Sequence, residues 1–207
     1  MSDIMQKFMR LHLATRVGWG LFLGATAISL LFALGGVPVR ELVRDPAAEF
    51  NYPAYGGLLS HLGIALMFGC TAICAFAATI ASGRRNVLWG AAWLSLALTL
   101  DDLFLLHEEV LPELLGLPEI LLYLLYAAIA AWLALSLRRE GAGIDLGGLY
   151  VAIAFLGLSV LVDVFKVHGP FSFWLEDFSK LSGYGAWLTF WSMCAHNAIT
   201  GETSDNQ

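Results

Sequence analysis

Histidine and carboxylate side chains gather near the same ends of several apolar segments, and these residue types can bind a metal ion or transfer protons. The histidines of this set are His61, His107 and His168. The carboxylates are Asp102, Asp163 and Glu176. Imidazole and carboxylate groups are common ligands of zinc and iron. We therefore expect a divalent metal, zinc or iron, held by the three histidines, with the three carboxylates as catalytic base or further ligands.

Proton transfer is a second chemistry open to the same groups. Burial and crowding of like charges raise the pKa of a carboxyl group toward neutrality, where it can act as a general acid or base. Four nearby charged residues would support the site or replace one of its members: Asp101, Glu108, Asp177 and Lys180. No segment has the close ligand spacing of a motif such as His-Glu-x-x-His, so the prediction rests on position and composition.

A short repeat supports the choice of these residues. Residues 102–107 and 163–168 both read Asp-x-Phe-x-x-His, and the two segments are offset by 61 positions. Residues five apart on an ideal helix point about 140° away from each other. Asp102 and His107 can therefore meet only if the helix ends or bends between them.

The elements that carry these residues read as membrane-spanning helices. Of the 207 residues, 58% are hydrophobic and 14% are charged, where soluble domains carry roughly 25% charged residues. The mean hydropathy is +0.72. A spanning helix needs about 20 apolar residues, and the runs that qualify lie at about 17–37, 56–81, 87–106, 120–137, 146–167 and 174–198. We predict an all-α, polytopic bundle of six transmembrane helices that forms a single integral membrane domain over residues 1–207.

The basic residues predict how the bundle is oriented. Seven of the eleven Lys and Arg residues fall on one side of the predicted spans: Lys7, Arg10, Arg16, Arg84, Arg85, Arg138 and Arg139. Loops rich in Lys and Arg face the cytoplasm. Both termini are therefore expected inside, in a multi-pass protein of a bacterial inner membrane. The histidine and carboxylate set then lies in the outer third of the membrane or at its outer rim.

Charge and small residues limit the partners. The formal net charge is −6, which excludes nucleic acid because that partner needs a basic surface. Membrane lipid is the expected partner. Gly18, Gly20 and Gly24 allow close helix contact, which suits a homo-oligomer or a larger membrane complex.

Three function classes fit these observations. The leading one is a metal-dependent hydrolase, or another enzyme, that acts on a lipid or amphiphile. A proton- or cation-coupled transporter and a non-catalytic subunit of a membrane complex are the alternatives. Local pairing, such as Glu176 with Lys180 four residues later on one helix, is the structural explanation that competes with all three, and the sequence does not decide whether the chain is an enzyme.

Overall fold

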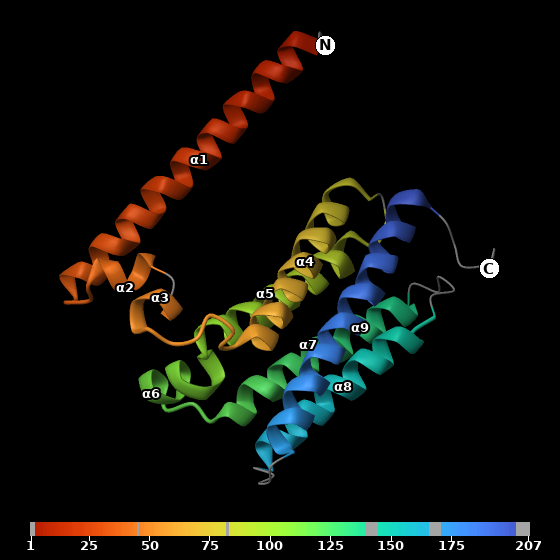
Figure 1. The fold of residues 1–207 in the computed structure, drawn as a ribbon. Coiled ribbons are helices and arrows are strands. Elements are labelled where there is room, and N and C mark those ends of the chain that lie inside the picture. Colours follow the sequence, from red (N-terminus) through yellow and green to blue (C-terminus); the bar gives the residue numbers. More distant parts are fainter. Residues whose placement is uncertain (1–2, 45, 82, 140–144, 166–170, 202–207) are drawn as a thin grey trace. The chain divides into compact units, whose positions relative to one another are not determined.

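The fold of the chain is all-helical in the part that the structure describes. The computed structural model describes residues 3–44, 46–81, 83–139, 145–165 and 171–201, and every regular element in these ranges is a helix (Figure 1). The all-α prediction is confirmed. The chain divides into two compact units, Met1–Gly56 and Gly57–Gln207. That the whole chain forms a single membrane domain stays a prediction.

The first unit is one long helix followed by two short ones. These are α1 (Asp3–Leu34), α2 (Val39–Val43) and α3 (Pro46–Phe50). The stretch Thr15–Leu34 of α1 is apolar and none of it is buried. Arg40 Nε lies 2.7 Å from Glu49 Oε2 and links α2 to α3. The exposed apolar surface of α1 is the surface expected of a helix surrounded by lipid.

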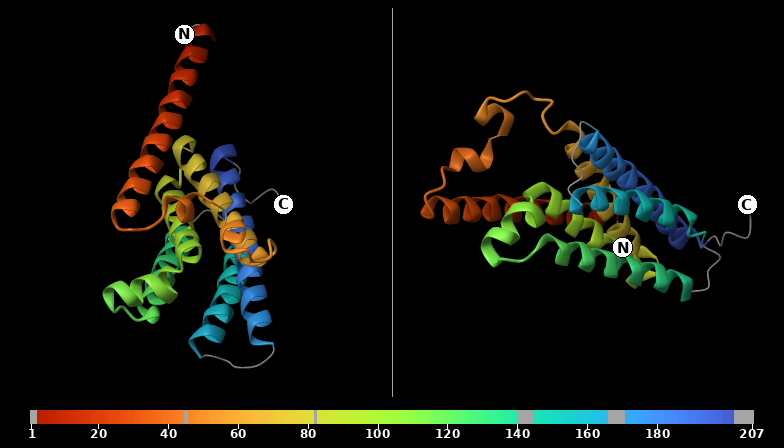
Figure 2. Two further views of the ribbon diagram at one scale, coloured as in Figure 1. Left: turned by 60° about the vertical axis from the view of Figure 1, so that its left-hand side comes forward. Right: turned by 90° about the horizontal axis from the view of Figure 1, so that it is seen from below.

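The second unit contains the remaining helices. They are α4 (Leu58–Ile80), α5 (Arg85–Phe104), the π-helix η1 (Leu106–Val110), α6 (Leu111–Leu115), α7 (Glu119–Arg139), α8 (Gly147–Val164) and α9 (Ser172–Thr200). Helix α9 packs along both α4 and α8, and α4 packs along α5 (Figure 2). Helix α7 lies beside α5 but has few contacts with α8.

Two glycines let α9 approach its neighbours closely. A Cβ atom added at Gly183 would lie 2.7 Å from the side chain of Leu156 on α8, and one added at Gly63 on α4 would lie 3.0 Å from the ring of Tyr184. These contacts are too short for any larger residue. They seat α9 against α8 and α4, with Trp187 and Trp191 fully buried in the core.

Helix α5 ends at Leu105, which adopts a left-handed backbone conformation with φ of +50°. This conformation costs a non-glycine residue roughly 1–2 kcal/mol. Backbone hydrogen bonds offset the cost, because the carbonyl oxygen of Leu105 accepts from the N–H groups of Glu109 and Val110. The break turns the chain into η1 and brings the backbone N–H of His107 to within 2.8 Å of the Asp101 carboxylate.

Among the described residues, five helices are long and apolar enough to cross a membrane. They are Thr15–Leu34, Leu58–Ile80, Arg85–Phe104, Glu119–Arg139 and Gly147–Val164, and they match the first five predicted spans. Helix α9 is longer, at 29 residues, but it carries Glu176, Asp177 and Lys180 near its start and is not one of the five. The chain therefore has the helices of a multi-pass membrane protein, while a sixth span stays a prediction.

Candidate functional site

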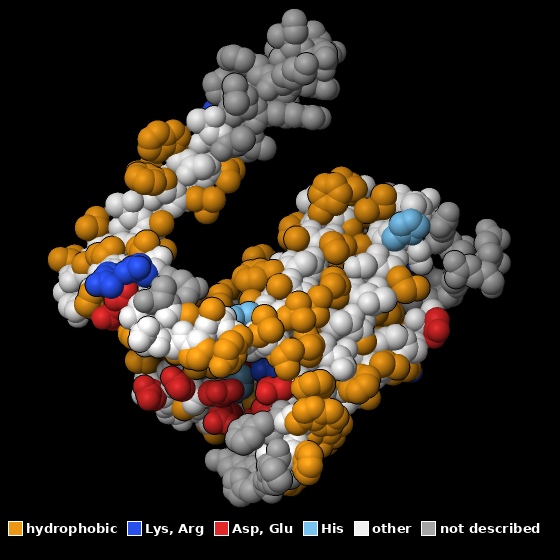
Figure 3. Space-filling view, in the orientation of Figure 1, with side chains coloured by type: hydrophobic (Ala, Val, Ile, Leu, Met, Phe, Trp, Pro, Cys, Tyr) orange, Lys and Arg blue, Asp and Glu red, His pale blue; other side chains and the backbone are white. Residues whose placement is uncertain are grey.

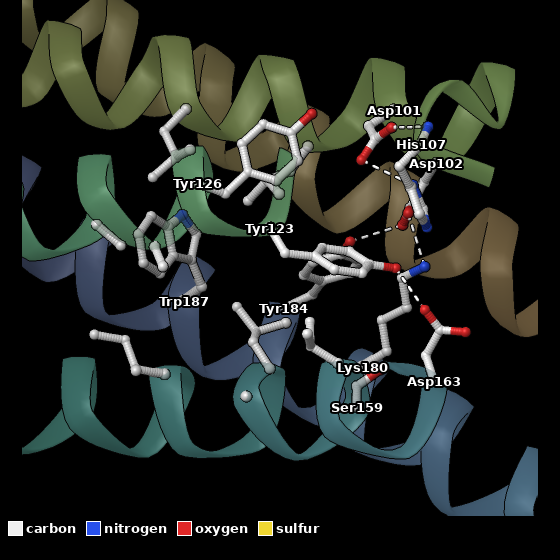
Figure 4. Close-up of a pocket in the computed structure, with 18 of the residues that line it drawn as sticks. Asp101, Asp102, His107, Tyr123, Tyr126, Ser159, Asp163, Lys180, Tyr184 and Trp187 are labelled. Carbon is white, nitrogen blue, oxygen red and sulfur yellow. Dashed lines mark hydrogen bonds and ion pairs between the residues drawn. The ribbon is translucent and has the colours of Figure 1, made fainter. Parts of the chain in front are cut away.

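The second unit encloses a pocket of about 220 Å³ between α5, η1, α7, α8 and α9 (Figure 4). Most of its wall is apolar, and Trp187 lies toward the apolar end. Ionisable side chains gather at the opposite end. Those predicted from the sequence are Asp101, Asp102, His107, Glu108, Asp163, Glu176 and Lys180. Seven of the ten predicted site residues therefore line one pocket.

Asp101 and His107 form a buried pair at this end. Asp101 Oδ1 accepts the backbone N–H of His107 at 2.8 Å. Its other carboxylate oxygen, Oδ2, lies 2.9 Å from Nδ1 of the imidazole. The Nδ1–H direction is poorly aligned with that oxygen, so this second contact is electrostatic rather than a well-formed hydrogen bond. Both side chains are about 95% removed from solvent.

The charges around His107 favour its protonated form. Burial alone would lower the pKa of the imidazole, but the contact with Asp101 and the negative charge of Asp101 outweigh burial and raise the pKa of His107. Glu108 raises this pKa further, and the positive charge of Lys180 opposes it. Glu108 Oε1 lies 3.4 Å from Nε2 on the other side of the ring. His107 is thus a titratable group held between two carboxylates.

Asp102 faces α9, and each of its two carboxylate oxygens contacts a residue of that helix. Lys180 Nζ lies 2.7 Å from its Oδ1 atom. The Tyr184 hydroxyl donates a hydrogen bond of 2.7 Å to its Oδ2 atom. The two partners come from successive turns of α9 and join that helix to α5. The carboxylate is therefore compensated although its side chain is only 8% exposed.

Asp163 on α8 is linked to His107 through a tyrosine of α7. The Tyr123 hydroxyl donates a hydrogen bond of 2.6 Å to Asp163 Oδ2. The ring of Tyr123 also packs against the imidazole of His107, with 5.2 Å between the ring centroids. Tyr123 and Tyr184 were missed by the sequence prediction, because tyrosine near the end of a span is also typical of ordinary interface anchoring.

Glu176, Glu108 and Asp177 extend the acidic character of this end. Glu176 is half-buried in the pocket wall, whereas about half of the Glu108 side chain is exposed. Asp177 lines a smaller neighbouring cavity of about 40 Å³, whose wall also includes Asp102 and Lys180. Acidic side chains gather visibly at this end of the second unit (Figure 3).

Two of the predicted histidines are not placed in the pocket. His61 lies in the first turn of α4 and is exposed. Its ring lies against Gly57, where an added Cβ atom would be 3.5 Å from Cε1, and it lines neither of the two cavities. His168 lies outside the described residues.

The predicted metal site is not assembled by the described residues alone. Among residues 3–44, 46–81, 83–139, 145–165 and 171–201, no group of three or more His, Cys, Asp or Glu side chains is placed to hold a metal ion. His168 belongs to the predicted ligand set and is not in these ranges. The zinc or iron site therefore stays a prediction.

Comparison with known proteins places the chain in a family. It belongs to the family described as domain of unknown function DUF8692, which matches residues 19–194. This range includes every residue that lines the pocket. No curated protein and no solved structure matches the chain.

Proposed function

We propose that the protein binds a membrane amphiphile in the large pocket and hydrolyses it, with His107 as general base. The observation that carries the proposal is the buried Asp101–His107 pair at the polar end of an otherwise apolar pocket. An amphiphile matches such a pocket, since its tail fits the apolar wall and its head fits the ionisable end. A histidine oriented by a carboxylate is a common general base.

The proposed step uses the two ring nitrogens differently. With a proton on Nδ1, which lies 2.9 Å from Asp101 Oδ2, the neutral ring carries its lone pair on Nε2. Nε2 takes a proton from water while the water oxygen bonds to the acyl carbon of the substrate. The bond to the leaving oxygen then breaks, and that oxygen receives the proton from His107. Asp101 stabilises the positive ring between these two transfers, and general base catalysis of this kind contributes about 10²–10⁴-fold.

Lys180 is placed to assist this reaction. Among the described residues that line the pocket, Lys180 is the lysine. Its Nζ atom lies 2.7 Å from Asp102 Oδ1, which holds the ammonium group in place. A cation fixed near the reacting centre stabilises the negative charge that develops on the carbonyl oxygen. In this role Asp102 is a positioning residue, and Lys180 is the group that faces the substrate.

The test uses the full-length protein in lipid nanodiscs and two histidine variants. A panel of lipid esters is incubated with the protein, and the released acids are measured by mass spectrometry. We expect His107→Asn to reduce turnover by about 100-fold or more, while the control His196→Asn, at an exposed histidine that lines neither cavity, retains it. Equal turnover in both variants would rule out His107 as the base. Failure of the unmodified protein to cleave any ester of the panel would contradict a hydrolase acting on lipid esters.

A metal-assisted form of the same reaction is the second candidate. Glu108, Asp163 and Glu176 line the pocket together with His107, and within the described residues no Lys or Arg forms an ion pair with them. Carboxylates of this kind can join His107 and His168, which lies outside the described residues, as ligands of zinc or iron, which would activate the attacking water. Metal analysis of the purified protein tests this form. Less than about a tenth of an equivalent of zinc or iron would contradict it.

We also propose that α9 crosses the membrane as a sixth span, with both termini in the bacterial cytoplasm. Its 29 residues extend over about 44 Å at 1.5 Å per residue, more than the hydrocarbon thickness of about 30 Å. The charged start of α9 would lie at the outer rim, beside the acidic end of the pocket. Fusions of alkaline phosphatase and green fluorescent protein to the C-terminus test this topology. A cytoplasmic C-terminus gives fluorescence and no phosphatase activity, and the reverse result contradicts six spans.

A further inference from the structure

Helices α7 and α8 follow each other in the chain yet have few contacts, and the large pocket lies directly behind the seam between them. Ala127 of α7 and Ile153 of α8 both line the pocket, and both are solvent-exposed. Exposed residues in a pocket wall lie where the pocket opens: Glu108 marks an opening at the polar end, and Ala127 and Ile153 mark another between α7 and α8. The seam, defined by these two residues, is therefore a side opening of the pocket.

The seam lies along two helices that are long and apolar enough to cross a membrane. Ala127 is eight residues from the start of α7, and Ile153 is eleven residues from the end of α8 at Val164. At 1.5 Å per residue these positions lie about 12 Å and 17 Å in from those helix ends. In a bilayer with a hydrocarbon core of about 30 Å, the opening faces acyl chains rather than water.

The size of the pocket limits what can enter. Its volume of about 220 Å³ exceeds that of a cavity of about 150 Å³ that binds benzene. It is smaller than the roughly 300–1,000 Å³ of pockets that enclose a drug-sized ligand. The pocket therefore takes part of one slender chain, the rest of the molecule staying outside it, and it has no room for two chains side by side.

We propose that the pocket takes a single-chain amphiphile, which enters sideways from the membrane through the seam between α7 and α8. This inference rests on the proposed function and names its substrate class. The chain of the amphiphile lies along the apolar wall, and its head lies beside Asp101, His107 and Lys180. A substrate already dissolved in the membrane reaches the site without leaving the lipid.

The first test compares two probes that share a head group. Full-length protein in nanodiscs is titrated with radiolabelled 1-lauroyl-lysophosphatidylcholine and with radiolabelled dilauroyl-phosphatidylcholine. We expect the single-chain probe to bind at least tenfold more tightly. Equal binding of the two probes would overturn the single-chain assignment and leave the proposed hydrolysis in place.

A glycine in the pocket wall provides the matched variant. Gly157 lines the pocket, and an added Cβ atom there meets nothing within 4 Å, so Gly157→Leu adds bulk in the pocket wall at a position whose Cβ atom has room. Gly69 on α4 has the same open surroundings and lines neither cavity. We expect Gly157→Leu to weaken binding of the single-chain probe at least tenfold and Gly69→Leu to leave it unchanged. Unchanged binding in both variants would overturn the assignment of the probe to this pocket.

The entry route has its own test. Ala127→Trp combined with Ile153→Trp blocks the seam, whereas Leu124→Trp combined with Leu158→Trp adds the same bulk at exposed positions that do not line the pocket. We expect the first pair to slow association of the single-chain probe at least tenfold and the second pair to leave it unchanged. Equal rates would overturn entry through the seam. Binding that persists without turnover would overturn hydrolysis alone, because binding does not require His107 as a base.

Discussion

The ammonium group of Lys180 lies 2.7 Å from the carboxylate of Asp102 and joins α9 to α5 at the polar end of the pocket. Removing one partner of a buried pair leaves the other charge without compensation. Lys180→Met should therefore lower the free energy of unfolding by about 3 kcal/mol, at the lower end of the range for buried pairs because Lys180 is 29% exposed. Thermal unfolding in detergent micelles measures the change.

An ion pair of the same length with a more exposed basic residue provides the control. Arg40 and Glu49 also lie 2.7 Å apart, and their side chains are 63% and 12% exposed. Arg44 Nη1 lies 3.6 Å from the same Glu49 oxygen and keeps a positive charge beside it when Arg40 is replaced. Exposed pairs contribute roughly 0–1 kcal/mol, so Arg40→Met should change stability little. An equal loss of unfolding free energy in Lys180→Met and Arg40→Met would contradict the buried character of the Lys180–Asp102 pair.

Protonation of His107 should link both stability and turnover to pH. The groups that face its ring are Asp101 from α5, Glu108 from η1 and Lys180 from α9, and together they raise the pKa of His107. The stabilising contribution of the protonated ring is complete below the ordinary histidine pKa of about 6.5. It is lost as the pH rises through the higher pKa of the folded protein. The proposed hydrolysis changes in the opposite direction, since a general base must be neutral, so turnover rises over the same interval.

Asp101→Asn separates the charge of Asp101 from its backbone hydrogen bond. The amide oxygen can still accept the backbone N–H of His107, as Asp101 Oδ1 does at 2.8 Å, but the negative charge is lost. Burial then lowers the pKa of His107, and the rise in turnover should move to lower pH. Turnover and the melting temperature measured against pH check this prediction. An unchanged pH midpoint in Asp101→Asn would show that Asp101 does not control the protonation of His107.

The backbone break at Leu105 should respond to glycine differently from its helical neighbour. Glycine adopts a φ of +50° without the steric cost that Leu105 bears, so Leu105→Gly should leave stability unchanged or raise it by up to about 1 kcal/mol. Leu103 lies inside α5, and Leu103→Gly should lower the free energy of unfolding by about 1 kcal/mol. Chemical unfolding of both variants gives the comparison. Destabilisation of equal size at both positions would argue against the left-handed turn.

Tyr123→Phe should remove the hydrogen bond to Asp163 while keeping the aromatic contact with His107. Asp163 would lose the donor that lies 2.6 Å away, and hydrogen bonds to charged groups contribute about 1.5–3 kcal/mol. We expect a loss of stability toward the lower value, since Asp163 is only half-buried. Thermal unfolding checks it, and Tyr123→Leu, which also removes the ring, should destabilise more. No change in Tyr123→Phe would contradict this contact.

Much of the fold could be predicted from the sequence, because the spacing of apolar runs and turn residues is strong evidence for spanning helices. Five predicted spans correspond to apolar helices of the structure. The gathering of ionisable residues at one end of the second unit was also predictable from their common depth. Helix α9 is less clear from its sequence, because His196, Asn197 and several Gly, Ser, Trp and Tyr residues lower the hydropathy even of the part that carries no charge.

The detailed pairing could not be predicted, because it depends on the rotation of each helix and on one backbone break. The repeat singled out Asp102 and His107 together, and the structure pairs Asp101 with His107 and Asp102 with Lys180. A left-handed conformation at a leucine has no sequence signature. The exposure of His61 could not be predicted either, because the hydrophobic residues of α4 are spread around the helix rather than along one stripe.

The ion pair between Asp102 and Lys180 has a second consequence, because both residues line the large pocket and the small cavity beside it. Tyr184 lines both spaces as well. A substitution such as Lys180→Met therefore alters the walls of both spaces at once, so their shapes are linked through one ion pair.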